Sequence, residues 1–299
     1  MRAVTYSIIA RDPAGGGFGV AVQSHFFGVG AIVPWARPGV GAVATQATAR
    51  IDYGPRGLEL MAGDASAPDA LAQALAEDPA ADARQVAMID AAGRVACHTG
   101  SRCIPYAGDV LGDGVSCQAN LMAAEGVPEA MLDAFLWESG PLAQRLLAAL
   151  EAAEAAGGDL RGRQSAALLV VPAEGEPWRT EVSLRVEDAD DPLSELARLL
   201  RLRSAYAAAS EGDDAAAAGR QADAAARYAH AAELAPELEE LRFWGALGLT
   251  AAGRAEEAVQ TLRELTAEND AWLELLARLP AELAPSAAEL RERLSDPSA

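Results

Sequence analysis

The pattern of hydrophobic and polar residues changes near residue 190, and each part predicts a different kind of structure. Before this point, short apolar runs rich in Val and Gly are separated by turns such as Asp90-Ala91-Ala92-Gly93, which is typical of strands. The runs predict strands at residues 4–10, 17–24, 30–34, 39–47, 85–90, 94–98, 114–119, 165–171 and 178–186. Two helical blocks, at about 55–75 and 128–156, interrupt these strands.

The order of these elements predicts a fold of the α+β class. Helices that are grouped between runs of strands are typical of α+β domains with layered sheets. The strand at Ala166–Val171 is apolar on both faces, so we expect both of its faces to be buried. We therefore expect an α+β domain over residues 1–187.

The remainder predicts an all-α domain over residues 188–299, after an acidic linker that ends at Pro192. The segment Gly219–Ala225 recurs as Gly253–Val259, and this spacing equals the tetratricopeptide period of about 34 residues. We expect a tetratricopeptide-like stack, which needs about three units and would be capped by residues 192–209 and 272–294. An unrelated helical hairpin bundle is the alternative interpretation.

Charge and cysteine content exclude several classes of function. The net charge of −20 disfavours binding to nucleic acid or to an anionic membrane surface. Three cysteines without a Cys-x-x-Cys spacing argue against a disulfide framework and a structural zinc site. There is no signal-peptide pattern and no apolar run of ~18 residues, so we expect a cytoplasmic protein.

The head of the first strand carries the first candidate chemistry. Thr5 opens a strand that begins close to the N-terminus. A threonine with a free α-amino group carries both a nucleophile and a base, because that amine titrates at about 7.7–8.0. The alternative is an ordinary N-terminal strand.

Five polar segments lie at the ends of apolar strands or in a loop that leads into one, where a rigid scaffold commonly presents a site. They are Gln23–Phe27, Thr45–Thr48, His98–Cys103, Ser116–Asn120 and Gly157–Ser165.

Six motifs together resemble a bacterial family named domain of unknown function 1028, over roughly residues 4–187. The motifs are Thr5–Ile8, Gly19–Phe26, Gly41–Gln46, Tyr53–Gly57, His98–Arg102 and Gly158–Ser165. That family looks like a member of the N-terminal nucleophile (Ntn) hydrolases. The resemblance implies a four-layer αββα sandwich that cleaves amides with an exposed first residue and needs no cofactor or metal.

Carried over by position, the resemblance implies that Thr5 is the nucleophile. Ser24 and His25 would lie beside it and orient its amine, which Asp159 would also bind. Asn120 would supply donors to the oxyanion, and removing one such donor typically costs ~10²–10³ in rate.

A second group of residues is expected to bind the substrate, a small-molecule or peptide amide. A guanidinium matches the geometry of a carboxylate, which favours Arg102 or Arg161 for an acidic substrate. The full candidate set for substrate binding is Gln46, His98, Thr99, Arg102 and Gln164. We expect residues 188–299 to bind a protein partner or mediate self-association, and a homodimer is consistent with the family resemblance.

The sequence departs from the Ntn pattern because Met1-Arg2-Ala3-Val4 precedes Thr5. A start at position 4 or self-cleavage would free the Thr5 amine. Two alternatives remain: a non-catalytic scaffold on a degenerate sandwich, and a metal-dependent hydrolase that uses His25 and His98 with a nearby carboxylate.

Overall fold

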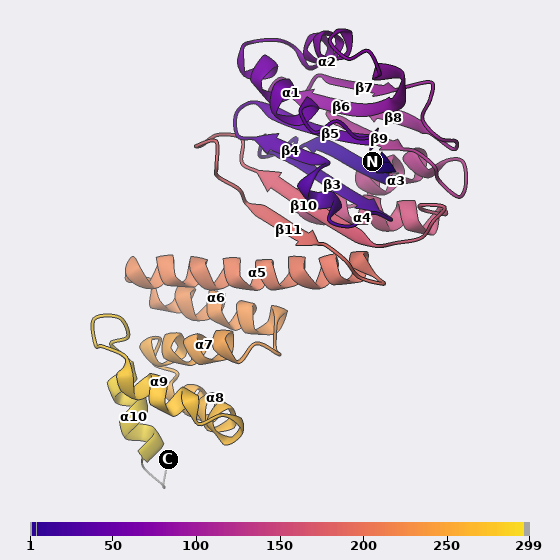
Figure 1. Ribbon diagram of the computed structural model, residues 1–299. Coiled ribbons are helices and arrows are strands. Elements are labelled where there is room, and N and C mark those ends of the chain that lie inside the picture. The colour runs from indigo at the N-terminus through magenta and orange to yellow at the C-terminus, as the bar shows by residue number, and fades with distance from the viewer. Residues whose placement is uncertain (1, 4, 296–299) are drawn as a thin grey trace. The chain divides into compact units, whose positions relative to one another are not determined.

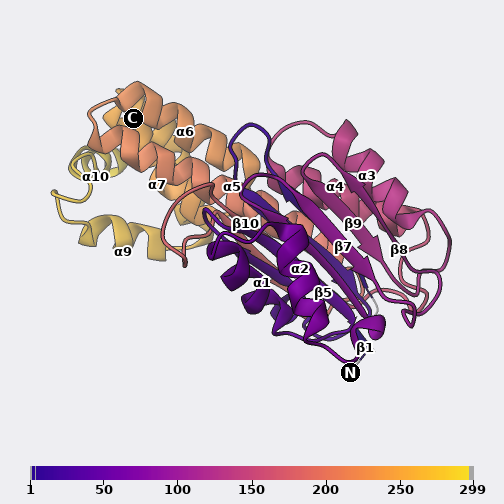
Figure 2. The same ribbon diagram turned by 90° about the horizontal axis from the view of Figure 1, so that it is seen from above.

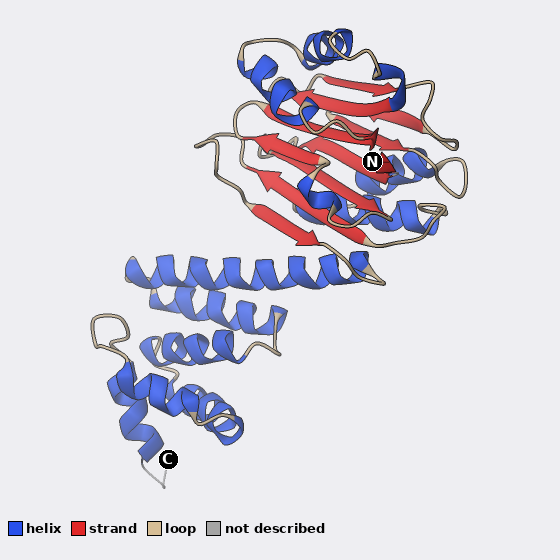
Figure 3. Cartoon of the chain, viewed as in Figure 1, coloured by secondary structure: helices blue, strands red, loops and turns tan. Residues whose placement is uncertain are grey.

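The computed structural model describes residues 2–3 and 5–295. It confirms an α+β fold with antiparallel sheets, followed by a helical region (Figure 3). Contacts within the chain group it into two compact units, Met1–Leu200 and Arg201–Ala299, and each is described by itself. The domain boundary expected after residue 187 stays a prediction.

The first unit contains two sheets in which all neighbouring strands are antiparallel. In the first sheet the order is β11 (Val182–Val186), β10 (Ser165–Val171), β3 (Phe18–Ser24), β2 (Thr5–Arg11), β9 (Val115–Ala119) and β8 (Gly108–Gly112). In the second sheet the order is β1 (Arg2–Ala3), β5 (Gly41–Thr48), β6 (Arg84–Asp90) and β7 (Val95–Thr99), and β4 (Pro34–Arg37) also pairs with β5.

Helices cover the outer face of each sheet (Figures 1 and 2). Apolar residues of α1 (Tyr53–Ala62) and α2 (Ala67–Ala76) pack against β5 and β6 of the second sheet. Those of α3 (Val127–Trp137) and α4 (Leu142–Ala155) pack against the first sheet. The two sheets therefore lie between two helical layers.

The space between the sheets has an apolar half and a polar half. Ile9 of β2 packs there with Ala42 and Ala87 of the opposite sheet. Because side chains alternate along a strand, Ser7 and Thr5 face the same space further along β2. At that end the inward-facing side chains are polar, and those fully or almost fully buried are Thr5, Ser7, Ser24, Gln46, Gln85, Ser116, Gln118, Asn120 and Ser165.

The prediction of one helix over residues 55–75 is wrong, because the structure has two helices there. Asp64 takes a positive φ of 70°, which stops α1, and the Ser66 hydroxyl accepts a hydrogen bond from the Asp69 N–H and caps α2. The predicted helix over 128–156 is also divided, because Gly140 has φ 100° and Pro141 directly precedes α4.

The predicted strand over 30–34 is wrong as well. Val29–Ala31 forms a 3₁₀ helix after Gly28, whose φ is 66°, and β4 begins only at Pro34. The Val29 N–H donates to the Ser165 hydroxyl, so this turn is fixed by a residue far away in the sequence. The sequence analysis also missed β8, whose three central residues lie between two glycines.

The second unit is helical. Its elements are the later part of α5 (Pro192–Ala217), then α6 (Gln221–Leu234), α7 (Glu239–Ala251), α8 (Ala255–Glu268), α9 (Ala271–Arg278) and α10 (Ala287–Ser295). Helices α6 and α8 have the same length, and the offset between them, at both ends, equals that of the sequence repeat. Within residues 2–3 and 5–295, no helix is both long and apolar enough to span a membrane.

Candidate functional site

Thr5 lies at the start of β2, fully buried, where the two sheets face each other. Its pairing partner in β3 is Ser24, and the Thr5 hydroxyl donates to Ser24 Oγ over 3.2 Å. The two hydroxyls therefore lie together at the polar end of the space between the sheets.

The carbonyl oxygen of Thr5 accepts hydrogen bonds from two residues, one on the opposite sheet and one directly after the neighbouring strand β9. Gln46 of β5 donates through Nε2 at 3.2 Å. Asn120, which follows β9, donates through its main-chain N–H at 3.1 Å and through Nδ2 at 3.4 Å. Hydrogen bonds from both sheets therefore hold the main chain of Thr5 in position.

Gln46 and Asn120 belong to a buried network of amide side chains that joins the sheets. Gln85 Oε1 accepts from Gln46 Nε2 at 2.8 Å and from Asn120 Nδ2 at 2.9 Å. Ser7 donates to Gln46 Oε1 and accepts from Gln118 Nε2, both at 2.6 Å. Buried polar groups that satisfy one another in this way fix the geometry of a site.

Asn120 Oδ1 is buried and has no hydrogen-bond partner in the described part of the chain. Both polar side-chain atoms of Gln23 are likewise unpaired among the described residues, so this acceptor does not by itself mark a site.

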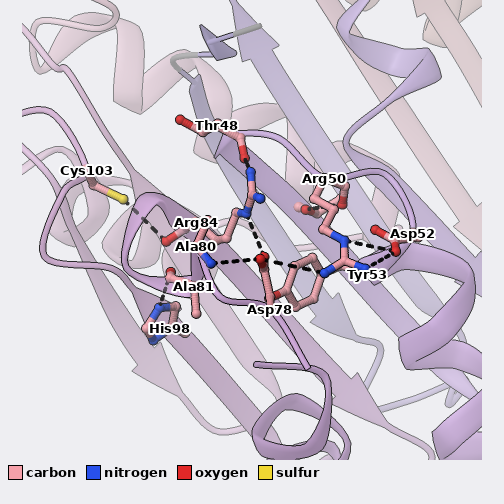
Figure 4. Close-up of polar contacts among 11 residues, drawn as sticks. Thr48, Arg50, Asp52, Tyr53, Asp78, Ala80, Ala81, Arg84, His98 and Cys103 are labelled. Atoms are coloured by element: carbon pink, nitrogen blue, oxygen red, sulfur yellow. Dashed lines mark hydrogen bonds and ion pairs between the residues drawn. The ribbon is translucent and has the colours of Figure 1, made fainter. Parts of the chain in front are cut away.

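A second polar cluster lies at the end of β5 (Figure 4). Arg84 donates to Asp78 Oδ2 at 2.8 Å and to the carbonyl oxygen of Thr48 at 2.5 Å. The Tyr53 hydroxyl and Arg50 approach the same carboxylate, at 3.1 and 3.6 Å. The hydrogen bond from Arg84 lowers the pKa of Asp78 to about 2, and burial raises the pKa of Tyr53.

A cavity of about 240 Å³ adjoins this cluster. Arg50, Asp52 and Tyr53 line it together with Arg56 and Glu77, which form an ion pair at 3.1 Å. Its lining therefore offers both signs of charge and one aromatic ring.

Two expected catalytic residues have partners other than Thr5. The His25 ring is exposed, and its Nδ1 lies 3.3 Å from the carbonyl oxygen of Arg163. The Asp159 carboxylate binds the Arg161 guanidinium at 2.8 Å and accepts from the main-chain N–H of His25 at 3.1 Å. Asp159 therefore holds the loop that leads to β10 against the end of β3.

The expected substrate-binding residues are spread over several places. His98 Nε2 lies 2.9 Å from the carbonyl oxygen of Ala81, on the helix-covered face of the second sheet. Arg102 pairs with Asp82 at the surface, and Gln164 donates to Asp188. Among this set, Gln46 contacts Thr5 directly, and Thr99 joins the network by accepting from Gln85 at 2.9 Å.

Among the residues that the structure describes, neither a metal cluster nor a reactive thiol stands out. Within residues 2–3 and 5–295, no group of three His, Cys, Asp or Glu side chains is placed to hold a metal ion. Cys97, Cys103 and Cys117 are free thiols, and burial raises the pKa of each. A raised pKa keeps a thiol protonated and weakly nucleophilic.

The sequence analysis missed Ser7, Gln85, Asp78 and Arg84. A signal for Ser7 exists in the sequence: Thr5 and Ser7, and likewise Ser116, Gln118 and Asn120, are polar residues at alternate positions of otherwise apolar strands. A period of two places such residues on one face, which marks a polar strip inside the fold. The Asp78–Arg84 pair has no comparable signal.

Comparisons with known proteins relate this chain to one protein family. A crystal structure of protein SPO2555 from Silicibacter pomeroyi, a DUF1028 protein, is similar to this chain with 31% sequence identity and a TM-score of 0.61. The similarity covers 66% of this chain and 88% of that one. No curated protein matches the chain significantly. The model of the family of unknown function DUF1028 matches residues 5–196, and the chain belongs to this family.

Proposed function

We propose that the first unit is an amidohydrolase of the N-terminal nucleophile type with Thr5 as its nucleophile. The two facing antiparallel sheets between two helical layers support the proposal of an αββα sandwich of the Ntn type. The single observation that carries the proposal is the position of Thr5. It heads an inner strand, its hydroxyl bonds to Ser24, and both sheets donate to its carbonyl oxygen.

The chemistry requires a free α-amine on Thr5, and therefore a chain without residues 1–4. The Thr5 hydroxyl oxygen attacks the amide carbonyl carbon while its proton passes to this amine. The C–N bond then breaks, the departing nitrogen takes the proton, and the acyl group remains as an ester on Thr5. Water attacks the ester, releases the acid and restores the hydroxyl.

Neighbouring side chains have distinct roles in this proposal. Ser24 orients the Thr5 hydroxyl. The Asn120 side-chain amide would stabilise the oxyanion by turning the N–H of its long 3.4 Å contact away from the Thr5 carbonyl oxygen and towards the substrate. Gln46 and Gln85 hold Asn120 and the main chain of Thr5 in position. His25, Asp159 and Gln164 belong to the surrounding loops and act only through the position of the strands.

The helical unit would serve a different purpose. Its two equal helices at the offset of the sequence repeat support a tetratricopeptide-like stack, and stacked helix pairs form concave surfaces that bind partners. We propose that it binds a protein partner or a second copy of the chain in the cytoplasm.

The test compares two forms of the protein, one that begins at Met1 and one that begins at Thr5. Each is incubated with a β-lactone probe, whose ring opens on a nucleophilic hydroxyl and adds the full mass of the probe. Peptide mapping by mass spectrometry then locates the modified residue. Thr5→Ala is the inactive variant, and Thr180→Ala, an exposed threonine before β11, is the matched control.

The form that begins at Thr5 and its Thr180→Ala variant should be labelled on Thr5, and turnover of a panel of aminocoumarin amides should follow the labelling. Thr5→Ala should show neither. If the form that begins at Thr5 folds but is not labelled, the hydrolase proposal is wrong and a non-catalytic binding role replaces it.

A further inference from the structure

The two residues of β1 occupy one edge of β5, close to Thr5 in the sequence. Arg2 pairs with Thr48 and Ala3 with Ala47, in antiparallel register. On the same edge of β5, β4 pairs with Gly41–Ala44 and stops before this position. In the described part of the chain, this edge at Ala47–Thr48 therefore has a strand partner only because β1 is present.

This end of β5 is fixed by a side chain from the neighbouring strand β6. Arg84, which is mostly buried, binds the carbonyl oxygen of Thr48 and is itself fixed by the buried carboxylate of Asp78 (Figure 4). Ala47 takes a φ of 69°, a left-handed conformation that a non-glycine residue adopts only where its surroundings impose it. Contacts outside β1 therefore help to fix this end of β5.

Loss of residues 1–4 would leave this edge unpaired. Exposed main-chain groups at a sheet edge are a template for another extended chain, and strand addition of this kind is a common mode of peptide recognition. β1 ends two residues before Thr5 in the sequence, so an extended chain in place of β1 would end close to Thr5.

We propose that Ala47–Thr48 is the docking site for the acyl side of the substrate, and that this acyl side is an extended peptide paired antiparallel to β5. In this view β1 stands where the substrate binds. The inference rests on the proposed function for its catalytic meaning, but the binding itself can be measured without any turnover.

The pairing also predicts which part of the protein would select among substrate side chains. Main-chain hydrogen bonds are independent of sequence, so affinity would come from the extended backbone. An antiparallel strand that continues past Thr48 runs towards Arg50, which belongs to the cavity and to the Asp78 cluster. Substrate residues further from the cleaved bond would therefore meet both signs of charge there.

The experiment uses the chain that begins at position 5 with Thr5→Ala, so that no probe is consumed. The probe is the acetylated and amidated peptide Met-Arg-Ala-Val, and binding is followed by amide NMR and calorimetry. The matched control is the same peptide with N-methyl groups on the Arg and Ala amides, which keeps the side chains but removes the donors. The chain that begins at Met1 is the second control, and thermal unfolding verifies that both chains are folded.

We expect the peptide to shift the Ala47 and Thr48 amide signals, the methylated peptide to bind at least tenfold more weakly, and the Met1 chain not to bind. Arg84→Lys should weaken binding while the shifts remain at the same amides. Equal binding of both peptides, shifts elsewhere, or no binding to a folded chain would overturn the inference. Turnover of small non-peptide amides without peptide binding would overturn it alone and leave the hydrolase proposal standing.

Discussion

Asp78 and Arg84 form an ion pair at 2.8 Å in which both side chains are largely withdrawn from solvent, 3% and 12% exposed. The pair connects the segment after α2 to β6 and, through the Thr48 carbonyl, to the end of β5. One ion pair therefore ties the end of β5 to the segment between α2 and β6, since Arg84 lies 36 residues after Thr48.

We expect Asp78→Asn to lower the free energy of unfolding at pH 7 by roughly 2 kcal/mol, because the folded pKa of about 2 lies below the ordinary value of 3.8. This stabilisation is fully present above the unfolded pKa and is lost as the pH falls through about 2. Urea unfolding from pH 7 to pH 2 should thus show a flatter pH dependence in the variant. Asp82→Asn, in an exposed pair with Arg102, is the control and should change stability by less than about 1 kcal/mol.

Gln85→Ala should destabilise the first unit by about 3 kcal/mol, since several buried partners lose their hydrogen bonds at once. Gln85 accepts from Gln46 and Asn120, and donates to the Ala119 carbonyl at 2.9 Å. Chemical denaturation measures the loss. The exposed Gln73→Ala in α2 should be nearly neutral, and an equally small effect at Gln85 would mean that the network contributes little.

Gly41→Ala should destabilise the second sheet by about 2–3 kcal/mol. Gly41 has a φ of 151°, and a Cβ there would lie 2.0 Å from the Ile89 carbonyl oxygen, which is main chain and cannot move aside. Gly108→Ala is the matched control, because no atom lies within 4 Å of its Cβ position. Similar melting temperatures for the two variants would contradict this explanation.

Two glycines of α7 should respond in opposite directions. A Cβ at Gly248 would lie 2.2 Å from the Tyr228 ring, whereas one at Gly245 would come no nearer than 3.7 Å to any atom. Gly248→Ala should destabilise the helical unit by about 1–3 kcal/mol. Gly245→Ala should be neutral or stabilising by up to about 1 kcal/mol, because alanine favours a helix. Hydrogen exchange of the α7 amides measures both effects, and protection that falls equally in both variants would refute the packing argument.

The sequence alone determined the elements whose signals are local. The strands around Tyr6–Ala10 and Val20–Val22 have continuous apolar patterns, and the structure places β2 and β3 there. The repeat of Gly219–Ala225 at Gly253–Val259 likewise corresponds to two equal helices, α6 and α8. The DUF1028 motifs identified the family correctly over most of the first unit.

Only the tertiary structure decided which of the candidate polar residues lie together. Four separate segments contribute Thr5, Ser24, Gln46 and Asn120. These residues meet because the start of β2 and the last residues of β3, β5 and β9 lie at the same end of the two facing sheets. His25 looked equally suitable in the sequence, yet its ring lies at the surface beside the Arg163 carbonyl oxygen. A hydrophobic pattern fixes which face of a strand is buried, but strand pairing and sheet packing decide which side chains face one another.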